Sequence, residues 1–297
     1  MNIQKITWNG LDAVEITTNK LHIIGVYSYG PRISSLKTID GENILLWEPQ
    51  KYTRGDWDLR GGHRCWHAGI NADECEMTYN TDNNPATCEI LSNGFILTGA
   101  PESTNKIRRG IKVTVTNENR LEVDSFTIND SDLLFGVVPW ALTCTIPSDN
   151  TEYIIPLGDN SSFDTATIVL FKEWAGHGQK HFKDDQFLIE EDAMVIKPNG
   201  KENKRMVQSA AGIIVMNDKN RNICFGKKRE FSSLEKYPLS TNVAAYIGPD
   251  NFMVEMETMG SETCLKPAQI SHHVEIWIIK NNCLCESTGK AAKALFD

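Results

Sequence analysis

Short runs of alternating apolar and polar residues, separated by turns, recur along most of the chain. Ile3–Trp8 and Ala13–Thr17 flank the dipeptide Asn9-Gly10, which favours the tight turn of a β-hairpin. Lys106–Asn117 and Arg120–Asn129 are longer runs of the same kind. Because successive side chains of a strand point to opposite faces, this alternation predicts strands with one apolar face.

Helical periodicity is missing from the body of this pattern. No stretch of ten residues before the C-terminal tail repeats its apolar positions at helical spacing. Strand-like runs instead return about every ten residues, which is typical of an all-β sandwich or barrel. No change of composition marks a boundary. We therefore expect one all-β domain over residues 1–285, followed by a tail over 286–297 with a short helix.

The run Phe252–Met259 carries two carboxylates on an otherwise apolar strand. Glu255 and Glu257 are two positions apart, so their side chains point to the same face. Like charges at close range and partial burial raise the pKa of one carboxyl group, which suits a general base. A solvated acidic face would give the same pattern, and that alternative stays open.

The following run, Ile270–Ile279, is predicted to pair with this strand across Lys266-Pro267-Ala268. It carries His272 and His273, whose side chains must point to opposite faces. One of the two is therefore expected near Glu255, although a pair of surface histidines would look the same.

The densest group of reactive side chains lies in residues 58–70. Within eight positions, a Gly-Gly pair is surrounded by five side chains that can bind a polar ligand: Arg60, His63, Arg64, Trp66 and His67. Guanidinium groups bind hydroxyls, carboxylates or phosphates; imidazole exchanges protons near neutral pH; an indole stacks on a sugar ring. A glycine-rich turn beside a core tryptophan is the alternative, but five such residues together favour a ligand-binding loop.

The composition of the 297 residues narrows the classes of function. The net charge is −9 without a long basic run, which argues against nucleic acid as a partner. No apolar stretch reaches the roughly 20 residues that cross a membrane, and the N-terminus lacks a signal-peptide pattern. A cytoplasmic protein is therefore expected, with its eight dispersed cysteines reduced. The cysteine spacing predicts no metal site.

Several motifs, taken in order over about residues 20–279, resemble the galactose mutarotase-like superfamily of aldose 1-epimerases and hexose-6-phosphate epimerases, and most closely a bacterial branch of it. The motifs are Tyr29-Gly30-Pro31-Arg32-Ile33, Leu59–His67, Asp82-Asn83-Asn84-Pro85, Pro139-Trp140-Ala141-Leu142-Thr143 and Val254-Glu255-Met256-Glu257. The resemblance implies a β-supersandwich with a concave site for a small sugar, and neither a metal nor another cofactor.

The resemblance also implies roles for individual residues. In the epimerases, a glutamate on the penultimate strand takes the proton of the anomeric hydroxyl; Glu255 falls at that position, and Glu257 is the fallback. Arg60 falls at an arginine that binds substrate in the phosphate-preferring members. The expected substrate-binding residues are Arg60, Arg64, Trp66, His67, Trp140 and Glu257.

The acid histidine of the epimerases has no counterpart, because residues 138–141 read Val-Pro-Trp-Ala. We expect a relocated acid, with His63 first and His67 and His177 after it. The leading hypothesis is thus a sugar 1-epimerase with Glu255 as base and His63 as acid. The alternative is a non-catalytic protein that binds or senses a sugar after losing the acid.

Overall fold

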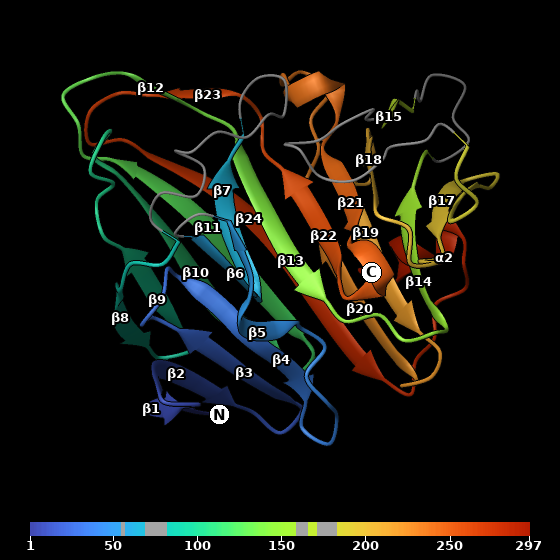
Figure 1. The fold of residues 1–297 in the computed structure, drawn as a ribbon, viewed down its shortest axis with the longest axis horizontal. Coiled ribbons are helices and arrows are strands. Elements are labelled where there is room, and N and C mark those ends of the chain that lie inside the picture. The colour runs from blue at the N-terminus through green and yellow to red at the C-terminus, as the bar shows by residue number, and fades with distance from the viewer. Residues whose placement is uncertain (55–56, 69–81, 159–165, 171–182) are drawn as a thin grey trace.

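The computed structural model describes residues 1–54, 57–68, 82–158, 166–170 and 183–297, and two antiparallel sheets of ten strands each form its body. The sheets pack face to face (Figure 1). This confirms the all-β sandwich expected from the sequence.

Strand neighbours are antiparallel within both sheets, and chain order and spatial order differ. The first sheet contains, in spatial order, β1 (Asn2–Trp8), β2 (Leu11–Thr17), β3 (Leu21–Val26), β4 (Arg32–Thr38), β7 (His63–His67), β13 (Pro139–Thr145), β22 (Val254–Met259), β21 (Val243–Ile247), β18 (Asn203–Val207) and β15 (Ile168–Leu170). The second sheet contains β16 (Phe187–Ile189), β17 (Ala193–Ile196), β14 (Thr151–Pro156), β19 (Ile213–Asp218), β20 (Ile223–Lys228), β24 (Ile270–Asn281), β11 (Arg120–Asn129), β10 (Ile107–Asn117), β9 (Gly94–Gly99) and β8 (Ala86–Leu91).

Smaller elements lie at the margins of the two sheets. They are the two-stranded sheets β5 (Trp47–Arg54) with β6 (Trp57–Gly61) and β12 (Phe135–Val137) with β23 (Thr263–Leu265), the 3-10 turns η1 (Pro238–Ser240) and η2 (Pro249–Asn251), and the helix α2 (Gly289–Ala294). The helix confirms the prediction for the tail. Ala292 of the helix, with Leu295 and Phe296 directly after it, is buried against the outer face of the second sheet.

The alternation read from the sequence builds the apolar core. The hairpin around Asn9-Gly10 is present, and both turn residues have positive φ, at 50° and 78°, as a primed turn requires. The strands β10 and β11 pair as predicted. Their inward side chains, such as Val113 and Val123, join the largest cluster of buried apolar residues between the sheets.

The Gly-Gly-His-Arg stretch is not the loop that the sequence suggested. Residues 63–67 form β7, which pairs with β4 and β13 in the middle of the first sheet. Gly61 and Gly62 make the turn into it at φ of 84° and 71°. A Cβ atom on Gly62 would lie 2.5 Å from the carbonyl oxygen of Ile33, so only glycine fits. Both faces of β7 are buried, which hid its alternation.

The predicted pairing of the strands around residues 252–259 and 270–279 is wrong. β22 lies in the first sheet between β13 and β21, whereas β24 lies in the second sheet between β20 and β11. The segment between them crosses from one sheet to the other, as connections in sandwiches do. His273 therefore faces the inner side of β22, and His272 points away and contacts Asp124.

A buried polar cluster joins the two sheets. We call it the inter-sheet cluster: Lys227, Glu275, Thr143, Thr258, His63 and His273. The Lys227 ammonium lies 2.9 Å from Glu275 and donates to Thr143 Oγ1 at 2.8 Å. Thr258 Oγ1 donates to Glu275 at 2.6 Å. Lys227 and Glu275 are on the second sheet and the two threonines are on the first. The hydrogen bonds between this ion pair and the threonines therefore connect the two sheets.

Removing the cation of this cluster should destabilise the fold. In Lys227→Met, Glu275 stays buried without its cation, and we expect the free energy of unfolding to fall by about 3–5 kcal/mol. Urea unfolding measures it. Lys201→Met, which breaks the exposed Lys201–Asp185 pair, is the control and should change little. Equal stability of Lys227→Met and the wild type would contradict a joining role for the ion pair.

Candidate functional site

The outer face of the first sheet, turned away from the second sheet, gathers charged and aromatic side chains. Since alternate residues of a strand share a face, β7 contributes Arg64, β13 contributes Trp140 and β22 contributes Glu255 and Glu257. The register places Leu142 of β13 between Arg64 and Glu257. We call these side chains, together with Lys204 of β18, the carboxylate face; the four strands that carry them lie in the first sheet (Figure 1).

Glu257 is held through one carboxylate oxygen. Its Oε2 accepts hydrogen bonds from Trp140 Nε1 at 2.6 Å and forms an ion pair with Lys204 Nζ at 2.9 Å. Its Oε1 is buried and receives no hydrogen bond from a described residue. The Lys204 ammonium also lies 4.4 Å from the centre of the Trp140 ring, a favourable cation–π distance.

Burial raises the pKa of the Glu257 carboxyl, because its side chain is fully shielded from solvent. Lys204 lowers this pKa and the nearby Glu255 raises it, with a net upward shift. A carboxylate with a raised pKa and an oxygen without a hydrogen-bond donor is prepared to accept a proton. The shift that the sequence expected for one carboxylate of the pair is thus found at Glu257.

Glu255 is held by different partners. Its Oε1 accepts from Arg64 NH2 at 3.1 Å and from the Cys144 thiol at 3.4 Å. Arg64 also lies over the Trp66 ring, 4.2 Å from the ring centre. Burial raises the pKa of Cys144 to about 12, so the thiol remains protonated and able to donate. The Arg64 guanidinium balances the charge of the Glu255 carboxylate.

Asp82 connects the residues around Arg64. Its Oδ2 accepts from Trp66 Nε1 at 2.8 Å and from Arg32 NH2 at 3.0 Å, and it lies 3.8 Å from Arg64 Nε. The sequence flagged Asp82 only through its motif. Asp82 lies three positions before Pro85 in a segment that looks like a loop. Nothing in that segment indicated the contact with Arg32, which is 50 residues earlier in the chain.

Arg60 belongs to the margin of this group. Its guanidinium donates to Asp58 at 2.9 Å and to Asn83 at 3.2 Å, and lies 3.5 Å from the centre of the Tyr29 ring. These contacts place Arg60 beside Asp82 rather than beside the β22 carboxylates, so its expected substrate contact remains a prediction.

His63 and His67 point to the other side of β7. His63 is fully buried between the sheets, with Nδ1 2.8 Å from Thr143 Oγ1, and His67 Nε2 is 2.7 Å from Thr127 Oγ1. Burial lowers the pKa of His63 well below its ordinary value and that of His67 to about 3. Both imidazoles are therefore neutral near pH 7. The strand's alternation separates them from Glu255, so the expected Glu255–His63 pairing across one sugar is not found; His177 lies outside the described residues.

Two residues of the carboxylate face were missed in the sequence. Lys204 lies on β18, a strand that the sequence pattern did not reveal because its outward positions are a lysine and a methionine. Tyr246 of β21 is paired in register with Glu255 and donates to Glu202 at 2.8 Å. Alternation along 243–247 could have placed Tyr246 on one face, but not beside Glu255.

Within the described part of the chain, no cluster of histidine, cysteine, aspartate or glutamate side chains has the arrangement of a metal site. Among the same residues, no helix has the length and apolar character needed to cross a bilayer.

Known structures resemble the fold of this chain, although no protein-family model and no curated protein sequence matches it. A galactose mutarotase-like protein from Lactobacillus casei superposes with a TM-score of 0.64 at 11% identity, over 90% of this chain and 100% of that one. One from Clostridium acetobutylicum gives 0.63 at 12%, over 94% and 98%. The fold is that of the galactose mutarotase-like proteins. A TPR-domain containing protein from Parabacteroides distasonis also matches, with a TM-score of 0.62 at 13% identity over 92% of this chain and 48% of that one, so the chain spans about half its length.

The shared architecture confirms the fold that the resemblance of the motifs implied. Identities this low establish architecture and leave the chemistry to be argued from the side chains of the carboxylate face.

The arrangement around Glu257 predicts a measurable titration. Lys204→Met removes the cation that lowers the pKa of Glu257, so we expect this pKa to rise further. Carbon-13 NMR of labelled glutamate carboxylates follows it. The exposed Lys201→Met is the matched control and should leave the Glu257 titration in place; a Glu257 pKa that does not move in Lys204→Met would refute the ion pair.

Proposed function

We propose that this chain is a sugar 1-epimerase in which Glu257 is the general base. The observation that carries the proposal is the Glu257 carboxylate: one oxygen is fixed by Trp140 and Lys204, the other is buried without a donor, and its pKa is raised. This role replaces the assignment of the base to Glu255, whose carboxylate faces Arg64.

Lys204 supplies the proton in place of the expected histidine. Glu257 Oε1 takes the proton of the anomeric hydroxyl while the Lys204 ammonium protonates the ring oxygen, and the bond between C1 and the ring oxygen breaks. Rotation about C1–C2 and reclosure on the other face of the aldehyde return both protons. The step converts an ion pair into a neutral pair, so no isolated charge forms in this buried site.

Arg64 and Glu255 are suited to orient the sugar rather than to react with it. Arg64 keeps its proton at all physiological pH values and offers several N–H donors in a fixed plane. Held together at 3.1 Å, the two groups present both donors and acceptors to neighbouring hydroxyls. Trp140 acts through Glu257, because its indole N–H is directed at that carboxylate.

The charge balance of the face supports a neutral sugar over a phosphorylated one. Arg64, Lys204 and Arg32 lie 2.9–3.1 Å from Glu255, Glu257 and Asp82, respectively. A phosphate would have to displace a carboxylate from one of these cations. The names of the matching galactose mutarotase-like structures also point to a sugar.

Loss of the base should abolish turnover. We expect Glu257→Gln to reduce the rate of mutarotation by about 10²–10⁴-fold, the usual value of general acid–base catalysis, with sugar binding retained. Polarimetry or NMR on freshly dissolved pure anomers of hexoses provides the measurement.

Glu190→Gln changes an exposed acid directly after the end of β16; it is the control and should behave as the wild type. If the wild-type protein accelerates mutarotation of no sugar in the panel, the epimerase proposal fails. Saturable sugar binding without turnover would then support the non-catalytic alternative.

The pH dependence of the reaction separates Glu257 from an ordinary carboxylate. The base acts when ionised, so kcat/KM should fall as the pH drops through a midpoint above 4.5, the ordinary glutamate value. Trp140→Phe removes a hydrogen bond that favours the ionised form and should shift this midpoint to higher pH. An unshifted acid limb in Trp140→Phe would argue against Glu257 as the group observed.

A further inference from the structure

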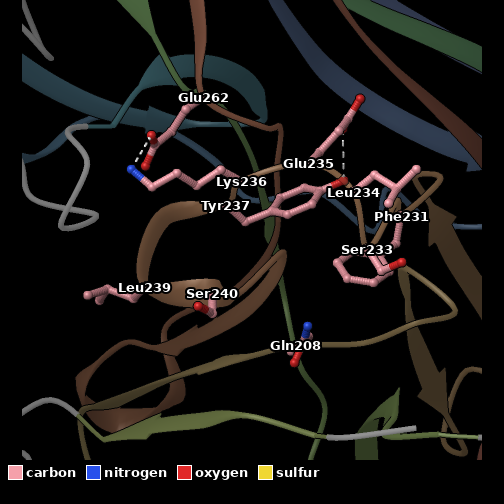
Figure 2. Close-up of a pocket in the computed structure, with 10 residues that line it drawn as sticks. All are labelled: Gln208, Phe231, Ser233, Leu234, Glu235, Lys236, Tyr237, Leu239, Ser240 and Glu262. Atoms are coloured by element: carbon pink, nitrogen blue, oxygen red, sulfur yellow. Dashed lines mark hydrogen bonds and ion pairs between the residues drawn. The ribbon is translucent and has the colours of Figure 1, made fainter. Parts of the chain in front are cut away.

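A cavity lies beyond the end of β22, outside the carboxylate face. It has a volume of about 520 Å³, within the range of small-molecule sites, and is formed by the segment 231–240 with Gln208 and Glu262 (Figure 2). None of these residues belongs to the proposed catalytic group.

Glu262 provides a polar anchor in this cavity. Its Oε2 accepts from the Lys236 ammonium at 2.7 Å, as Figure 2 shows, whereas its Oε1 is buried and has no hydrogen-bond donor among the described residues. The side chain is 20% exposed. A carboxylate oxygen can only accept hydrogen bonds. A ligand that binds to Glu262 Oε1 must therefore donate one from a hydroxyl or amine group. Lys236 already balances the charge of Glu262, which favours a neutral hydroxyl.

An aromatic surface lies next to this anchor. The rings of Phe231 and Tyr237 are stacked, with centres 5.1 Å apart and planes inclined by 30°. Arg229 donates to the Tyr237 hydroxyl at 3.0 Å and so fixes the ring. The amide oxygen of Gln208 accepts from Thr167 Oγ1 at 3.2 Å. The amide N–H groups of Gln208 therefore point away from Thr167. Aromatic rings combined with a few hydrogen-bonding groups suit a sugar ring, which has an apolar face and hydroxyl edges.

The cavity adjoins the carboxylate face. Leu239 of its wall packs against the apolar cluster that contains Trp140 and Met206. Glu262 follows Glu257 by five residues, which is at most about 18 Å along an extended chain. Glu262 also lines a neighbouring cavity of about 480 Å³ next to Ala68 and Val138. An oligosaccharide could therefore reach from Glu257 to Glu262.

We propose that this cavity is a second sugar subsite. In it, Glu262 accepts a hydrogen bond from a sugar hydroxyl, and the Phe231–Tyr237 pair packs on the sugar ring. The protein then binds the reducing end of an oligosaccharide at Glu257 and a further sugar unit in this cavity. The inference rests on the proposed function for the position of the reducing end. The subsite itself rests on the cavity, the buried oxygen of Glu262 and the aromatic pair.

The test compares binding of monosaccharides and disaccharides. Calorimetry with glucose, galactose, maltose, cellobiose and lactose should show at least one disaccharide binding more tightly than its monosaccharide. Glu262→Ala and Phe231→Ala should each weaken disaccharide binding by about tenfold, the effect of losing one charged hydrogen bond or one aromatic contact, and leave monosaccharide binding and mutarotation unchanged. Glu190→Ala is the matched control, and thermal unfolding verifies that each variant is folded.

The outcomes distinguish the two proposals. Equal binding of monosaccharides and disaccharides, an unchanged disaccharide affinity in Glu262→Ala, or no binding of any sugar overturns the subsite. Disaccharide binding that depends on Glu262 without any mutarotation supports the subsite and overturns the epimerase.

Discussion

The Lys227–Glu275 ion pair between the two sheets is the constraint on which the rest of the structure depends. A charge pair buried in a sandwich core is tolerated only when hydrogen bonds complete it, and here Thr143 and Thr258 of the opposite sheet do so. Thr258 therefore faces inward, and the alternation of β22 makes Glu257 face outward. A register slip of one residue would break this cluster and bury Glu257 in the core at the same time.

The same alternation places the polar side chains of β7 on opposite faces of the first sheet. His63 and Arg64 are neighbours in sequence, yet His63 lies between the sheets as a neutral partner of Thr143, and Arg64 lies on the carboxylate face with Glu255. Burial decides their protonation: it lowers the pKa of the histidine, and raises that of Glu257. Residues that look like one catalytic cluster in the sequence thus form two separate groups on opposite sides of one strand.

The site combines a shared architecture with side chains of its own. Galactose mutarotase-like structures at 11–12% identity share this fold, and a shared fold does not decide which groups react. In this chain, Lys204 and Trp140 both contact the Glu257 carboxylate. The cavity around Glu262 extends the polar surface beyond β22, and its loop position allows it to vary without disturbing the sheets.

The sequence alone determined the all-β class, the first hairpin, the long pair β10 and β11, the helical tail and the shared face of Glu255 and Glu257, because each follows from local alternation or turn chemistry. It misassigned β7, whose two buried faces leave no polar alternation, and paired β22 with β24, which lie in different sheets. Only the tertiary structure decided that His63 is neutral, that Lys204 lies beside Glu257 and Asp82 beside Arg64, and that burial raises the pKa of Glu257. These properties depend on burial and on contacts between distant strands, which a pattern along the chain does not contain.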